Sequence, residues 1–292
     1  MKRNHLIITD SGCDIPPELE TALGIDVLPF SILIDDKEYL ERVDLSPQKF
    51  YALATVAATV PKTTQLKTEL FYKKFKSCEK YETVFVVLIN ATGSATYANA
   101  DAALKQIRAE GLCPNTDIRL FDGRAYSISY GYPLVEAAKK LIRGCSPDEV
   151  AAYLEDMFSS LETYILAFDL KFAKKSGRIN AAAAFLGEMM GLKPIISLID
   201  GVSHVEKKCR GEKILLPEAV EYISSRSIPD TPWLLLRTTV TPQEDEFLRI
   251  MSKRMKAPPA MVSYAGCAVG ANSGPKIIGV IIKGKDRGKR NV

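Results

Sequence analysis

One stretch, residues 83–97, constrains the fold of this chain more than any other. Residues 84–89 form a continuous apolar run of β-branched and aromatic side chains, which is typical of a strand buried on both faces of a sheet. Small and polar residues interrupt the run at 90–93, and a helical pattern of apolar positions then extends from Ser94 to a stop at Gly111. The sequence therefore predicts a strand, a short loop and a helix in direct succession.

This strand-loop-helix unit has the features of an anion site. The first turn of a helix leaves backbone N–H groups free and carries the positive end of the helix dipole. The hydroxyl groups of Thr92, Ser94 and Thr96 stand beside that turn in the sequence. An ordinary N-cap explains the same residues, so this stretch alone leaves both interpretations open.

The same alternation of strand and helix recurs through the first half of the chain. Strands are predicted at 5–9 and at 118–121, and each is followed by a polar loop and a helix. This order favours a three-layer α/β/α domain with a largely parallel sheet.

The second half follows a different order. Residues 193–208 predict a β-hairpin in which Asp200 and Gly201 suit a type I′ turn, and the elements after it mix helices and strands. This order favours a two-layer α+β domain with a mixed sheet. We therefore expect an α/β protein of two domains, residues 1–161 and residues 162–292.

Composition argues against several classes of protein. The formal net charge of the 292-residue chain is +4, and much of it lies in the terminal KGKDRGKR, so we expect no nucleic-acid partner. The six cysteines lack any Cys-x-x-Cys spacing and the two histidines lack a metal-ligand neighbour, so we expect free thiols and no metal site. No apolar run has the length of a signal-peptide core or a transmembrane helix, so we expect a cytoplasmic protein without stable membrane insertion.

Four segments rich in hydroxyl groups recur along the chain, at residues 9–14, 63–65, 92–96 and 272–273, and we expect each to lie in a loop, the last of them in a loop at 269–275. Loops at the carboxyl ends of parallel strands share one edge of a sheet, where ligands bind. Several neutral donors at one point suit a carboxylate or a phosphate. Nucleotide binding is weakly supported, because the chain has neither the lysine of a P-loop nor a G-x-G-x-x-G motif.

Two alternative functions use other features of the chain. Ser94 is the candidate nucleophile of an acyl hydrolase or transferase, but its TGSAT context lacks the second glycine of a G-x-S-x-G elbow and no histidine stands near it. Lys171, Lys174, Lys175 and Arg178 share a helix face if the helix continues through Gly177. That face is either solvated or contacts an anion or a protein partner.

Six motifs, in order, resemble those of the DegV family over nearly the whole chain. They are Thr9-Asp10-Ser11 with Asp14, Thr63-Thr64-Gln65, Ser94-Ala95-Thr96-Tyr97, residues 172–179, Lys193-Pro194-Ile195 and residues 270–275. The resemblance implies two domains that bind one long-chain fatty acid, with its tail in an apolar tunnel. It also implies a carrier that needs no cofactor, has no catalysis of its own and presents the acid to a fatty-acid kinase partner.

The resemblance also implies which residues form the site. Thr63 and Ser94 would hold the carboxylate, Arg178 would support it electrostatically, and the helix at 181–190 would form part of the tunnel wall. The full set of expected carboxylate ligands is Thr63, Thr64, Ser94, Thr96, Asn272 and Ser273, with Asp10, Ser11 and Arg178 in support.

The sequence departs from the family pattern at three places. Leu66 and Lys67 replace a proline and a serine, and residues 90–91 replace a pair of serines. Asn272 replaces a histidine, so the charge that an imidazole would carry near the head group is absent at this position.

Overall fold

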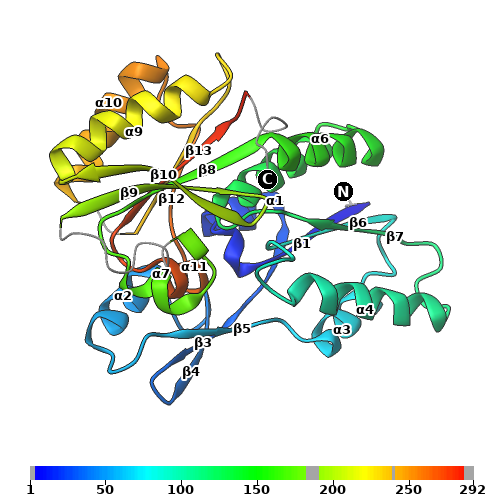
Figure 1. Cartoon of the computed structure of the whole chain (residues 1–292). Helices are drawn as coiled ribbons and strands as arrows, with labels where there is room; N and C mark the ends of the chain where they lie inside the picture. Colours follow the sequence, from blue (N-terminus) through cyan, green and yellow to red (C-terminus); the bar gives the residue numbers. More distant parts are fainter. Residues whose placement is uncertain (1–3, 182–190, 239–240, 286–292) are drawn as a thin grey trace.

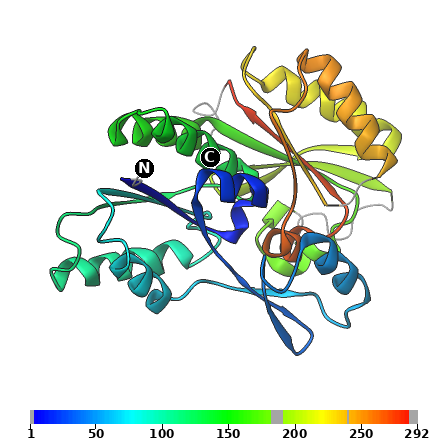
Figure 2. The ribbon, with the colours of Figure 1, turned by 180° about the vertical axis from the view of Figure 1, so that it is seen from behind.

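The computed structural model describes residues 4–181, 191–238 and 241–285 (Figures 1 and 2). The first half is built on β1 (His5–Asp10), β2 (Ile25–Leu28), β6 (Thr83–Leu88) and β7 (Asp117–Asp122). These strands form one sheet in the order β2-β1-β6-β7, and every neighbouring pair is parallel. All six residues of β6 are buried, which confirms the predicted central strand.

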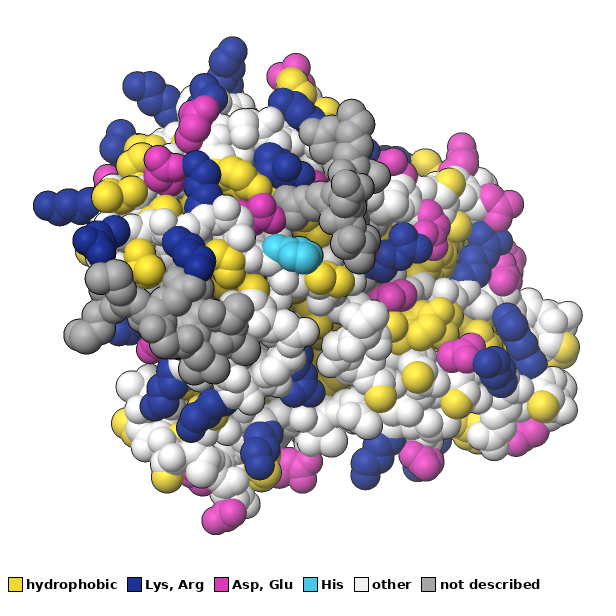
Figure 3. All heavy atoms as spheres, in the orientation of Figure 1, with side chains coloured by type: hydrophobic (Ala, Val, Ile, Leu, Met, Phe, Trp, Pro, Cys, Tyr) yellow, Lys and Arg dark blue, Asp and Glu magenta, His cyan; other side chains and the backbone are white. Residues whose placement is uncertain are grey.

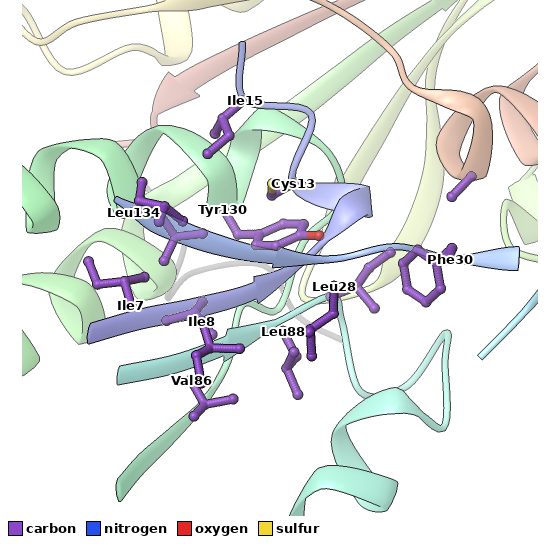
Figure 4. Packing of buried hydrophobic residues seen from close by; sticks show 14 of the residues in the cluster. Ile7, Ile8, Cys13, Ile15, Leu28, Phe30, Val86, Leu88, Tyr130 and Leu134 are labelled. Atoms are coloured by element: carbon purple, nitrogen blue, oxygen red, sulfur yellow. The ribbon is translucent and has the colours of Figure 1, made fainter. Parts of the chain in front are cut away.

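Helices cover both faces of this parallel sheet. They are α1 (Pro17–Leu23), α3 (Thr68–Lys76), α4 (Thr96–Ala109), α5 (Ile128–Ile142) and α6 (Pro147–Ser160). The first half also contains α2 (Pro47–Val56), which lies beside α11 (Cys267–Ser273) in Figure 1, and a short 3-10 helix, η1 (Ser11–Cys13). Figure 1 shows α3 and α4 on one side of the sheet and α1 and α6 on the other. On the second side the ring of Tyr130, from α5, packs over β1 among the apolar side chains around Ile8 (Figure 4). The predicted three-layer α/β arrangement is confirmed.

A small antiparallel sheet extends from this half. Its strands are β3 (Ser31–Ile34), β4 (Lys37–Leu40) and β5 (Lys62–Thr64), in the order β4-β3-β5. Residues 63–65 were expected to be a loop, and the structure instead pairs Thr63 with Ile32 and Thr64 with Ser31. The strand has three residues, and Lys62 and Thr64 are exposed, so it carries no apolar pattern that marks a strand.

The second half is built on a six-stranded mixed sheet. Its strands are β8 (Leu161–Ala167), β9 (Leu192–Ile199), β10 (Val202–Arg210), β11 (Leu234–Arg237), β12 (Met261–Tyr264) and β13 (Ile277–Lys283), in the order β10-β9-β8-β13-β11-β12. β9 and β10 form the predicted hairpin, and positive φ angles at Asp200 (49°) and Gly201 (77°) fit a type I′ turn. Only the β11–β12 pair is parallel, which confirms the predicted mixed sheet.

The two faces of the mixed sheet have different neighbours. The helices α9 (Glu212–Arg226) and α10 (Pro242–Met255) cover one face and form a separate core with Trp233 and Phe247. The short helices α7 (Lys171–Ser176) and α11 (Cys267–Ser273) lie on the other side, toward the first half (Figure 1). Leu234 and Ile281 belong to the large core of the first half. The predicted boundary after residue 161 falls one residue into β8, directly after α6, and the division into two independent domains stays a prediction.

Residues 269–275 were expected to be a loop, and the structure instead places most of them in α11, whose C-cap is Gly274 (φ 87°). The helix packs against α2, and a β-carbon at Gly270 would lie 2.6 Å from the Tyr51 hydroxyl. Tertiary packing therefore stabilises a helix whose glycine, asparagine and serine have low helix propensity.

Three further expectations concern the whole chain. All six cysteines are free thiols, and five of them are buried. No helix among the described residues is long and apolar enough to span a membrane. Figure 3 shows Lys and Arg side chains interspersed with acidic ones on the face it presents.

Candidate functional site

A cavity of about 460 Å³ lies where the two halves of the chain face each other. Its walls come from the end of β5, the loop between β6 and α4, the residues before α5, α11 and the inner face of the mixed sheet. Segments from both halves are therefore required to enclose it. The expected tunnel wall at 181–190 lies outside the described residues except for Ala181, which is buried.

The floor of the cavity belongs to the mixed sheet and is largely apolar, with Thr163 of β8 as its one polar residue among those described. Alternation along the strands directs Ile165 of β8 into the cavity, while Tyr164 and Leu166 join the core under α9 and α10. Gly279 of β13 lies opposite Ile165 on one side and Leu236 of β11 on the other. Because Gly279 has no side chain, the middle of the floor leaves space above the sheet.

The rim of the cavity is polar. Six of the nine residues expected at the site line it, namely Thr63, Thr64, Ser94, Arg178, Asn272 and Ser273. Thr63 and Thr64 arrive from the edge strand β5, and Ser94 arrives from the loop after β6. The structure thus brings together three of the four hydroxyl-rich segments of the sequence.

Thr96 does not line the cavity. It is fully buried behind Ser94, and its Oγ1 accepts a hydrogen bond from the Leu66 backbone N–H (3.3 Å) and one from Ser94 Oγ (2.9 Å). α4 begins at Thr96, and the side chain of its N-cap residue, Ala95, makes no capping hydrogen bond. Ser94 lies two residues before the first residue of the helix and lines the cavity.

Asp10 and Ser11 do not reach the cavity either. The Asp10 carboxylate accepts hydrogen bonds from Ile89 N (2.7 Å), Gly12 N (3.0 Å) and Tyr130 Oη (2.6 Å). Burial raises the pKa of Asp10 to about 6, against these hydrogen bonds, which lower it. Ser11 Oγ donates to Glu41 (2.6 Å). Asp10 and Ser11 thus bind neighbouring loops, and neither is among the residues that line the cavity.

Arg178 lines the cavity but does not share a face with the lysines before it. α7 ends at Ser176, and Gly177 follows in the left-handed region (φ 70°), so the helix does not continue to Arg178. The exposed guanidinium of Arg178 donates to the backbone oxygen of Ser176 (2.8 Å). The proposed four-residue basic face of Lys171, Lys174, Lys175 and Arg178 is therefore wrong, although Lys171 and Lys175 are exposed.

Asn272 is a half-buried residue of α11, and its side-chain amide is partly engaged. Its Nδ2 donates to the backbone oxygen of Ala268, one helical turn earlier (2.8 Å). A carbonyl oxygen can only accept, so this contact fixes which end of the amide carries the N–H groups. One N–H and the amide oxygen remain for other partners.

The sequence analysis missed Tyr126 and Ser127, which line the cavity. Asn90 Nδ2 donates to Tyr126 Oη (3.0 Å) and to Thr92 Oγ1 (3.0 Å). Burial raises the pKa of Tyr126, so its hydroxyl stays protonated at neutral pH. Gly93 packs so closely against this hydroxyl that a β-carbon there would overlap it.

Ser127 has a strained backbone (φ 60°), and its Oγ donates to Asp14 (2.5 Å). One sequence signal pointed to this region. Both residues follow β7, the neighbour of β6 in the parallel sheet, and the loops after neighbouring parallel strands lie together.

The cavity is nearly neutral. Among the described residues that line it, Arg178 alone carries a charge, and no histidine is present. Hydroxyl groups and the amides of Gln65 and Asn272 surround one part, whereas mainly aliphatic side chains form the floor. This arrangement suits a molecule with a small polar head and an apolar body. It supplies no base, within the described lining, to activate Ser94 as a nucleophile.

Comparison with known proteins agrees with this architecture. Residues 4–285 match the model of the DegV family, which is described as a family of uncharacterised proteins. A DegV domain-containing protein of Caldanaerobacter subterraneus is 26% identical over 286 residues, which cover 96% of this chain and 98% of that protein. Protein DegV of Bacillus subtilis is 24% identical over 284 residues, covering 95% and 98% of the two chains.

Solved structures share the fold. A DegV family protein of Thermus thermophilus, described as binding fatty acid, superimposes with a TM-score of 0.84 at 23% identity, over 97% of this chain and 100% of that one. A fatty acid binding DegV family protein of Streptococcus agalactiae gives 0.85 at 21% identity, over 97% and 99%. Because the family model spans nearly the whole sequence, this chain belongs to the DegV family.

Proposed function

We propose that this protein binds one long-chain fatty acid. The carboxyl group lies at the polar rim near Thr63 and Ser94, and the acyl chain extends over the apolar floor near Gly279. The observation that carries this proposal is the division of one cavity into a hydroxyl-lined rim and an aliphatic floor. The solved relatives described as fatty-acid binding support the same class of ligand.

The energetics favour an acyl chain over a short acid. Burying one methylene contributes about 0.8 kcal/mol, so a chain of about a dozen contributes on the order of 10 kcal/mol before the cost of ordering it. The head group then needs only hydrogen-bond partners for its oxygens, which neutral hydroxyls supply. A nearly neutral cavity is therefore compatible with tight binding of a carboxylate.

A direct titration tests the proposal. Purified protein from which bound lipid has been removed is titrated with hexadecanoate and with hexanoate. We expect one hexadecanoate to bind per chain and hexanoate to bind at least about a hundredfold more weakly, because about ten fewer methylenes are buried. Equal weak binding of both acids would contradict an acyl-chain site.

Presentation of the bound acid to a fatty-acid kinase subunit stays a prediction of the family resemblance. Thr64 and Gln65 line the cavity and are also exposed. A head group beside them would be accessible to a second protein. Hydroxylamine trapping of an acyl phosphate, after mixing the loaded protein with ATP and a kinase from a relative, tests this step.

A further inference from the structure

We propose that Thr96 is a positioning residue of the head-group site, which relays a hydrogen bond from the Leu66 backbone to Ser94. This inference rests on the proposed function, because it concerns how Ser94 comes to donate to a carboxylate. Thr96 itself does not touch the cavity and has no exposed surface. Its role is to let the Ser94 proton point toward the ligand.

The geometry forms a chain of three groups. The Leu66 N–H lies 3.3 Å from Thr96 Oγ1, and Thr96 Oγ1 lies 2.9 Å from Ser94 Oγ. Ser94 Oγ also lies 3.3 Å from the Thr96 backbone N–H, which donates to it. Ser94 is half-buried and lines the cavity, so the chain runs from a buried peptide group to the cavity wall.

The number of donors and acceptors on each group decides which directions the hydrogen bonds of this three-group chain can take. An N–H can only donate, so Thr96 Oγ1 must accept from Leu66, whereas each hydroxyl can donate one hydrogen bond and accept two. In the structure, Ser94 donates to Thr96. When an anion lies against Ser94, rotation of the two O–H bonds reverses this contact. Thr96 then donates to Ser94, and the Ser94 proton is free for the anion.

The reversal keeps every hydrogen bond of the chain and adds one. The added bond is assisted by the ligand's charge, and such bonds are about twice as strong as neutral ones. Hydrogen bonds in a chain also polarise one another, which strengthens the terminal donor. Without the Thr96 hydroxyl, Ser94 Oγ would keep only the longer hydrogen bond from the Thr96 backbone N–H (3.3 Å) and would lose the hydroxyl donor that orients its proton toward the cavity.

A second contact of Leu66 makes it possible to test the hydrogen-bond relay separately from the anchoring of the Leu66 backbone. Asn99, also on α4, donates from Nδ2 to the Leu66 backbone oxygen (2.7 Å). Thr96 therefore binds the backbone N–H of Leu66 and Asn99 binds its backbone oxygen, but only Thr96 is also bonded to Ser94. Asn99→Ala is therefore a matched control that loosens Leu66 and leaves the relay in place.

The test compares tetradecanoate with tetradecanol in the full-length protein. We expect Thr96→Val, which keeps the shape and removes the hydroxyl, to weaken tetradecanoate binding about tenfold and tetradecanol binding less than threefold. We expect Thr96→Ser to bind both within threefold of the unmodified protein. Asn99→Ala should change both ligands by similar factors. In a Ser94→Ala background, Thr96→Val should add less than a twofold loss.

Two results would overturn the relay: equal losses of acid and alcohol in Thr96→Val, or additive effects of the Ser94 and Thr96 substitutions. Circular dichroism and thermal unfolding confirm that each variant is folded. If Thr96→Val is not, Thr96→Cys replaces it under the same criteria, since a thiol is a weak donor and acceptor. Failure of the unmodified protein to bind tetradecanoate would contradict the proposed function itself, whereas normal binding with an unaffected Thr96→Val would contradict only the relay.

Discussion

The Glu41 carboxylate accepts a hydrogen bond from the backbone N–H of Ala268, although the two residues are 227 positions apart (3.0 Å). Its second oxygen accepts from Ser11 Oγ (2.6 Å). Glu41 is almost completely buried, and Ala268 stands in the first turn of α11, which carries Asn272 and Ser273 to the cavity. One acidic side chain of the first half therefore fixes the position of a helix from the second.

We expect Glu41→Ala to destabilise the protein by about 2–4 kcal/mol, because buried donors at Ser11 and Ala268 lose their partner. Glu41→Gln, which keeps one acceptor oxygen, should cost less. Urea denaturation at neutral pH measures both free energies of unfolding. A loss below about 0.5 kcal/mol in Glu41→Ala would show that α11 is held by packing alone.

We expect Asp10 to lower the free energy of unfolding as pH rises. Burial raises its folded-state pKa to about 6, above the ordinary 3.8. The folded state therefore favours the protonated carboxyl. The contribution of Asp10 is fully present below about pH 4 and is lost as pH rises through about 6, a change of about 3 kcal/mol.

Denaturation of the unmodified protein and of Asp10→Asn between pH 4 and 7 checks this. The amide does not titrate, so the unmodified protein should lose stability relative to the variant across that range. A constant difference between the two proteins at all pH values would mean that Asp10 keeps its ordinary pKa.

Thr63→Ala and Ser94→Ala should each weaken fatty-acid binding by about 1–3 kcal/mol, since a buried carboxylate would lose a donor. The corresponding fatty alcohol should lose less. Ser159→Ala, at an exposed hydroxyl far along α6, serves as the matched control. Equal losses for acid and alcohol would mean that these residues shape the cavity only, and ester hydrolysis abolished by Ser94→Ala would favour the enzyme alternative.

Gly279→Val should shorten the longest acyl chain that the protein accepts. A β-carbon at Gly279 would lie 3.0 Å from Leu236 Cβ, so the added side chain fills the middle of the floor. Titration with saturated acids of 8 to 18 carbons, a series chosen around the proposed long-chain class, measures the effect. The shortest acids are the internal control and should bind as before. An unchanged profile for the longest acids would place the acyl chain elsewhere.

Asn272 leads us to expect fatty-acid affinity that is nearly constant from about pH 6 to 8, because an amide does not titrate there and the ligand carboxyl stays largely ionised. Asn272→His should bind more tightly at the acid end as the imidazole protonates. Binding titrations of both proteins across this range check the slope. If the unmodified protein changes as steeply as the variant, another titrating group controls the head-group site.

Local sequence patterns were enough to predict the strand, loop and helix around Ser94, because a buried strand and an amphipathic helix have distinct periods. They missed β5, a three-residue strand whose two end residues are exposed. They also missed α11, whose small residues form a helix that packs against Tyr51. In both places tertiary packing overrides weak local preference.

Sequence patterns likewise predicted some residues of the candidate site and not others. Thr63, Ser94 and Asn272 stand in motifs whose hydroxyl and amide groups signalled polar contacts. The same signal also included Asp10, whose carboxylate accepts hydrogen bonds inside the fold, because sequence alone does not distinguish such a carboxylate from one that faces a ligand. Tyr126 was missed because a single aromatic residue in a loop carries no pattern.

Fatty-acid binding is tested most directly by denaturing mass spectrometry of lipid extracted from freshly purified protein. We predict long-chain fatty acid at close to one molecule per chain, reduced in Gly279→Val for the longest species. Protein that is consistently empty, and that also fails to take up added long-chain fatty acids, would contradict it.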